Sequence, residues 1–79
     1  MLVKKIEFEY ADQTTEQLKA FLDANDLTIN NLSESQIMDE LDIIIGKAAL
    51  GGNQTISIAY DTNNFVVGWR IRSKSLPPE

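Results

Sequence analysis

The sequence contains no cysteine and no histidine among its 79 residues. Without these side chains the protein has no zinc site of the usual kind and no Cys–His or Ser–His catalytic pair. It also lacks the side chain that most often serves as an acid or base near neutral pH. We therefore expect a protein that is not an enzyme and that binds no metal ion or other cofactor. The lack of cysteine also rules out disulfide bonds, which fits a reducing compartment.

Long apolar runs are missing as well. No segment approaches the roughly 20 apolar residues that a membrane-spanning helix needs. The first ten residues include Glu7 and Glu9 and do not form the apolar core of a secretion signal. We therefore expect a cytoplasmic protein with no membrane association.

The composition is that of one small folded domain. Hydrophobic residues make up 43% of the chain and charged residues 24%, whereas disordered segments are poorer in hydrophobic residues. A chain of 79 residues has no room for a second domain or for a deep cleft between lobes. We expect a single domain over residues 1–73 and a flexible tail over residues 74–79, which contain two prolines.

Positive charge is scarce and unevenly placed. Seven Lys and Arg residues stand against twelve Asp and Glu residues, a net charge of −5. Residues 1–45 carry a net charge of −7, and residues 46–79 carry +2. An acidic domain repels phosphate backbones, so nucleic acid is an unlikely partner. Arg70 and Arg72 are the residues from which binding of an anion or a nucleic acid could start.

The clearest pattern is a β-hairpin near the end of the chain. Apolar residues alternate with small or polar ones from Gln54 to Tyr60 and again after the polar cluster 61–64. The second alternating set is Phe65, Val67, Trp69 and Ile71. This period of two predicts two strands that share one apolar face, with Trp69 in the core. The connection is either a four-residue loop over 61–64 or a two-residue turn at Asn63-Asn64, and both keep the same face apolar.

The first fifty residues predict one more strand and two helices. Leu2 to Tyr10 alternates like the hairpin. Thr14 and Gln17 have the spacing of a capping box, which begins a helix that ends near Asn25-Asp26. Residues 27–32 form a connector or a short strand. A second capping pair, Ser33 and Gln36, begins a helix that runs from Glu34 to about Leu50 and ends at Gly51-Gly52.

This order, β-α-α-β-β, predicts an α+β two-layer sandwich: a three-stranded sheet covered on one face by two helices. We expect the third strand in the centre, parallel to the first. That arrangement places Glu7 near Arg70 and Glu9 near Arg72, and such cross-strand pairs are slightly stabilising. This pairing would also give the two arginines a structural role, so that no bound ligand is needed to account for them. A meander with the second strand in the centre is the alternative.

The second helix has two apolar residues outside its buried stripe. The stripe consists of Ile37, Leu41, Ile44, Ile45 and Ala48, which share one arc at about 100° per residue. Ile43 and Leu50 lie on the other side. The polar residues around them are Asp39, Glu40, Asp42 and Lys47. A small apolar patch with a polar rim is typical of a protein interface, so we interpret these six residues as a contact surface.

Three functions follow from these patterns. The first is a small acidic module for protein–protein interaction, such as a regulator or inhibitor, that presents its second helix to a basic protein surface. The second is a non-catalytic structural domain that pairs with a second copy through a sheet edge or through the small-sided open face of the sheet. The third and least favoured is a binder of anions or nucleic acid through Arg70 and Arg72.

Overall fold

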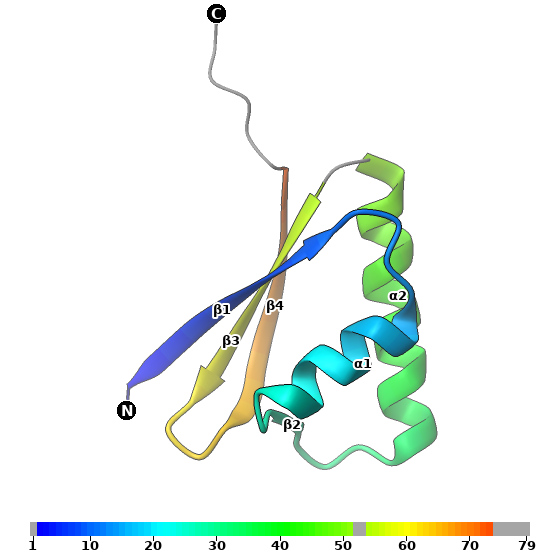
Figure 1. The fold of residues 1–79 in the computed structure, drawn as a ribbon. Coiled ribbons are helices and arrows are strands. Elements are labelled where there is room, and N and C mark those ends of the chain that lie inside the picture. The colour runs from blue at the N-terminus through cyan, green and yellow to red at the C-terminus, as the bar shows by residue number, and fades with distance from the viewer. Residues whose placement is uncertain (1, 52–53, 74–79) are drawn as a thin grey trace, which may run out of the picture.

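The computed structural model describes residues 2–51 and 54–73, which form an α+β fold as the sequence predicts. The elements, in order, are β1 (Val3–Tyr10), α1 (Thr15–Ala24), β2 (Thr28–Ile29), α2 (Glu34–Gly51), β3 (Gln54–Asp61) and β4 (Phe65–Ser73). Both helices lie on one face of a mixed sheet, and the opposite face is open (Figure 1). The expected tail 74–79 and the expected helix terminator Gly52 lie outside the described residues.

The strand order is β1-β3-β4-β2, so the predicted central position of the last strand is wrong. The meander alternative is correct for three strands: β3 pairs antiparallel with β1 on one side and with β4 on the other. Glu7 lies opposite Ser57, and Ser57 lies opposite Arg70, so a whole strand separates the two charges. The central strand is the most buried strand of a sheet, and β3 suits that position because its only charged residue is its last, Asp61. A cross-strand charge pair is worth less than about 1 kcal/mol, too little to reverse this preference.

The connector 27–32 contains a fourth strand, which was the alternative to a plain loop. β2 runs parallel to β4, and Thr28 and Ile29 pair with Phe65 and Val66. The Thr28 N–H donates to the Asn64 carbonyl oxygen over 2.9 Å. Because β2 has only two residues, it covers the outer edge of β4 only where β4 begins.

The hairpin loop has three residues, Thr62 to Asn64, which matches neither predicted turn. Asn64 has a φ of 65°, a left-handed conformation that Asn tolerates. One carboxylate oxygen of Asp61 accepts the N–H of Asn63 at 2.9 Å and that of Phe65 at 3.0 Å. A bulge follows inside β4, where an extra residue, Val67, lies between the partners of Tyr60 and Ala59. The bulge is what changes the predicted pairing.

The bulge inverts the face on which the first residues of β4 lie. Ile58 pairs with Trp69, but the register shifts after Ala59, so that Tyr60 pairs with Val66. Val66 therefore packs against the core, and Val67 is 55% exposed. The prediction that Val67 shares the buried face with Trp69 is wrong, because an extra residue in one strand reverses the alternation beyond it.

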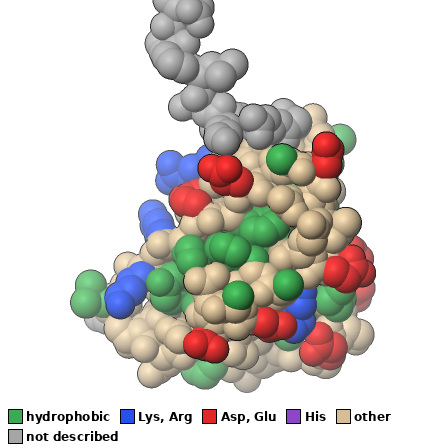
Figure 2. Space-filling model, viewed as in Figure 1, with side chains coloured by type: hydrophobic (Ala, Val, Ile, Leu, Met, Phe, Trp, Pro, Cys, Tyr) green, Lys and Arg blue, Asp and Glu red, His purple; other side chains and the backbone are tan. Residues whose placement is uncertain are grey.

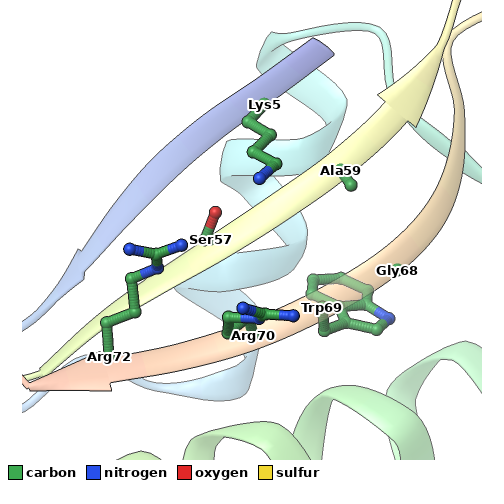
Figure 3. A pocket seen from close by; sticks show the side chains of 7 residues that line it. All are labelled: Lys5, Ser57, Ala59, Gly68, Trp69, Arg70 and Arg72. Carbon is green, nitrogen blue, oxygen red and sulfur yellow. The ribbon is translucent and has the colours of Figure 1, made fainter. Parts of the chain in front are cut away.

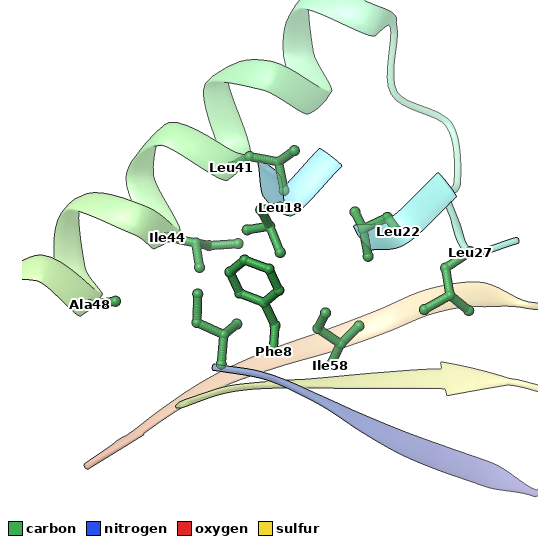
Figure 4. Packing of buried hydrophobic residues seen from close by; sticks show 9 residues of the cluster. Phe8, Leu18, Leu22, Leu27, Leu41, Ile44, Ala48 and Ile58 are labelled. Atoms are coloured by element: carbon green, nitrogen blue, oxygen red, sulfur yellow. The ribbon is translucent and has the colours of Figure 1, made fainter. Parts of the chain in front are cut away.

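One hydrophobic core joins the helices to the sheet (Figure 4). Its buried members are Phe8, Leu18, Leu22, Leu27, Leu41, Ile44, Ala48, Ile56 and Ile58. Phe8 meets Phe21 of α1 edge to face, with ring centroids 5.1 Å apart. Figure 2 shows that apolar side chains also reach the surface in the middle of one side of the molecule, between the sheet and the helices.

Polar side chains fix the helix starts and join the two helices. Both predicted capping boxes are present: Thr14 and Gln17 bond reciprocally at α1, and Ser33 and Gln36 do so at α2. The Thr15 hydroxyl donates to the Asp42 carboxylate across the helix pair. Lys19 contacts Asp23 at 3.1 Å and Glu34 at 3.5 Å. The hydrogen bond to Asp23 raises the pKa of Lys19 above its ordinary value.

Candidate functional site

A groove of about 260 Å³ lies between α2 and β4. We call it the α2–β4 groove. Its apolar lining consists of Ile43, Ile44, Trp69 and Ile71, and its polar lining consists of Glu40, Lys47 and Arg70. An apolar floor with a polar rim is the composition of many protein interfaces.

The phase of α2 places Ile43 at this groove. Ile44 is 6% exposed and belongs to the core, whereas Ile43, rotated by about 100° from it, is 56% exposed. Glu40 and Lys47 precede and follow Ile43 by about one helical turn, on the side that faces β4. Ile43 therefore extends the apolar surface of the core to the outside of the molecule.

The outer edge of β4 borders the same groove. β2 pairs with β4 only at Phe65 and Val66. From Val67 to Ser73, the described part of the chain offers no strand on this side of β4. An unpaired strand edge presents backbone N–H and C=O groups that can pair with another extended chain. The groove thus combines the exposed Ile43 and the partly buried Trp69 and Ile71 with a row of backbone groups that no described strand pairs with.

The six residues predicted as one contact surface do not all lie together. Glu40, Ile43 and Lys47 line the groove. Asp42 accepts a hydrogen bond from Thr15 and so faces α1, because it lies about 100° around α2 from Ile43. Asp42 joins the two helices and is not among the residues that line the groove, so its place in the contact surface stays a prediction.

Asp39 and Leu50 lie on nearly the same side of α2 as Ile43, about one turn before it and two turns after it. Both are exposed, and Leu50 is the most exposed of the large hydrophobic residues in the described chain, at 89%. Neither lines the α2–β4 groove. The exposed side of α2 thus carries Ile43 and Leu50, and only Ile43 lies in the groove with apolar side chains of β4.

Two important residues of the groove were predicted only as core. Trp69 and Ile71 pack against the core but are only partly buried, because no strand covers β4 beside them within the described residues. Their place beside the groove follows from the strand order, in which β3 is central and β4 pairs beyond Val66 with no other described strand.

Arg70 and Arg72 are exposed on the open face of the sheet. Neither is adjacent to Glu7 or Glu9, because β3 lies between the two strands. Glu7 and Glu9 are therefore not the direct cross-strand neighbours of Arg70 and Arg72 that the predicted strand order required. Arg70 lies at the junction of two surfaces, since it lines both the α2–β4 groove and a second hollow on the open face.

The described residues include neither a cluster of metal ligands nor a membrane-spanning helix. Residues 2–51 and 54–73 contain no group of three acidic side chains arranged to hold a metal ion. No helix in this part of the chain combines the length and hydropathy that crossing a bilayer requires.

No family model matches this chain, and no curated protein or solved structure is significantly similar to it. The function is therefore inferred from the geometry of the groove and of the sheet.

Proposed function

We propose that this protein is a non-catalytic, cytoplasmic protein-binding module whose α2–β4 groove accepts an extended segment of another protein. The observation that carries the proposal is the edge of β4 from Val67 to Ser73, which pairs with no strand among the described residues and lies beside the apolar lining of the groove. A segment that pairs with Val67–Ser73 would satisfy the free backbone groups of β4. Its side chains would alternate between the helix side and the open face.

The side chains around the edge define the chemistry of that segment. On the helix side it would meet Ile43, Trp69 and Ile71, which favour apolar side chains. On the open face it would meet Arg70 and Arg72, which favour carboxylates because guanidinium groups bind them bidentately. Glu40 and Lys47 on the α2 rim offset each other in charge. The favoured partner segment therefore alternates apolar and acidic residues, and binding it would occupy that region of the partner, as a regulator or inhibitor does.

A display library of short random peptides tests this function. Wild-type protein is expected to enrich peptides with apolar–acidic alternation. Ile43→Lys is expected to weaken the best peptide by about thirtyfold, because it places a charge on the apolar floor at the centre of the contact. Leu50→Lys is the matched control, an equal change on the same helix outside the groove, and is expected to change affinity by less than about twofold.

The control for folding is the thermal unfolding midpoint. Because Ile43 is 56% exposed, Ile43→Lys should change the free energy of unfolding by no more than about 0.5 kcal/mol. If the Ile43→Lys variant is unfolded, Ile43 belongs to the core and its assignment to the groove is wrong. If the enriched peptides bind both lysine variants equally, the groove is not their binding site. Light scattering of the pure protein is expected to show a monomer; a dimer that Ile43→Lys dissociates would instead assign the groove to a second copy.

A further inference from the structure

The open face of the sheet carries a second hollow, separate from the α2–β4 groove in most of its lining. Its volume is about 140 Å³, and it is lined by Lys5, Ser57, Ala59, Gly68, Trp69, Arg70 and Arg72. Ser57, Ala59 and Gly68 form a floor of short side chains on β3 and β4. Figure 3 shows Lys5 reaching across this floor from β1, and Arg70 and Arg72 flanking it on β4.

The register of the sheet explains why the hollow forms. Lys5, Ala59 and Gly68 make one row across the three strands. The next row is Glu7, Ser57 and Arg70. The central residue of each row is small, so the long side chains on the outer strands stand around a depression. An added Cβ at Gly68 would meet no atom within 4 Å, which shows that this part of the floor is open.

The three cations at this hollow have no ionic partner in the described chain. Within residues 2–51 and 54–73, the ion pairs belong to Lys19, on the helical side of the molecule. Lys5, Arg70 and Arg72 are all exposed, and no carboxylate is among the described residues that line the hollow. Three like charges around one depression repel one another, so their arrangement favours a bound anion.

We propose that this hollow binds a tetrahedral oxyanion, either inorganic phosphate or the phosphate group of a small phosphomonoester. Two guanidinium groups and an ammonium group approach the floor from both sides, and the Ser57 hydroxyl lies beneath them. A phosphate offers enough acceptor oxygens for all three cations, whereas a carboxylate offers only two. A long nucleic acid is a poorer fit, because the net charge of −5 repels its remaining phosphates.

Glu7 limits the affinity of the site and supplies a direct test of it. Its carboxylate lies on the same open face of β1, opposite Ser57, and competes for the same cations. Glu7→Gln is therefore expected to tighten phosphate binding by a few-fold. A stabilising role for Glu7 would not predict this gain.

Fluorescence of Trp69, which is the single tryptophan and lines the hollow, provides the readout. Inorganic phosphate, O-phosphoserine and acetate are titrated into the whole protein at constant ionic strength. Phosphate and phosphoserine are expected to saturate the signal, and acetate is not. Equal affinity for the first two would identify the free anion as sufficient, and tighter phosphoserine binding would identify a phosphomonoester; either outcome supports the proposal.

Matched variants test whether phosphate binds at this hollow. Arg72→Gln and Lys5→Gln are each expected to weaken phosphate by about tenfold, since each removes one charged donor. Lys4→Gln is the control: it removes the same charge from the neighbouring residue, whose side chain lies on the other face of β1. Gly68→Val should block binding by filling the open floor. Equal responses to phosphate and acetate, or equal weakening by Lys4→Gln and Lys5→Gln, would overturn the proposal.

Discussion

Replacing Ile58 with alanine is expected to unfold most of the protein at room temperature. Ile58 is fully buried in the central strand β3, between Ile6 of β1 and Trp69 of β4. Truncating a buried isoleucine to alanine costs about 2–5 kcal/mol, because apolar surface is lost from the core and a cavity remains. The net stability of a domain of this size without disulfides is on the order of 3–5 kcal/mol. The stability lost by the substitution is therefore comparable to the total stability of the domain.

Urea unfolding followed by circular dichroism measures this effect. Val67→Ala is the matched control, because it truncates an aliphatic residue of the same hairpin that is 55% exposed. It is expected to change the free energy of unfolding by less than about 0.5 kcal/mol. Similar unfolding curves for the two variants would mean that the bulge has been placed incorrectly and that the faces of β4 are reversed.

Replacing Asp61 with alanine is expected to destabilise the hairpin by about 1–3 kcal/mol, because two backbone N–H groups lose their acceptor. Asp61 is 9% exposed, and one of its oxygens accepts hydrogen bonds from Asn63 and Phe65. Asp61→Asn keeps an oxygen at the same position and is expected to recover most of the loss. The comparison separates the hydrogen bonds from the side-chain volume. Equal destabilisation by alanine and asparagine would show that the carboxylate charge, and not the acceptor geometry, stabilises the loop.

The sequence predicts the element types because each carries a strong local pattern. The alternation in β1 and β3 and the capping boxes at Thr14 and Ser33 depend on neighbouring residues alone. They correspond to elements close to their predicted bounds. The short strand β2 was only an alternative, since two residues cannot show a period.

The strand order and the bulge could not be predicted in the same way. Charge pairing between Glu7 and Arg70 predicts the wrong neighbour, because this surface attraction is weak compared with the burial that favours the uncharged β3 as the central strand. The bulge lies at Val67, inside β4, and the apolar alternation of the sequence runs through that position without a break. One inserted residue then exchanges Val67 for Val66 in the core.

The candidate site could be predicted only in part, because it also depends on the strand order. Helical periodicity placed Ile43 and Leu50 outside the buried stripe, and both are exposed. It could not show that Ile43 meets Trp69 and Ile71 across a groove, because that contact depends on which strand lies at the edge. Nor could it show that Asp42 bonds to Thr15, which depends on where α1 packs.

The most direct test of the binding surface is an amide correlation spectrum of the labelled protein with and without the most enriched peptide. We expect the largest shifts from Val67 to Ile71 and at Ile43 and Lys47, with slower hydrogen exchange along the outer edge of β4. Shifts confined to β1 and α1, where apolar side chains also reach the surface (Figure 2), would contradict the account. So would shifts confined to the last turn of α2 around Leu50.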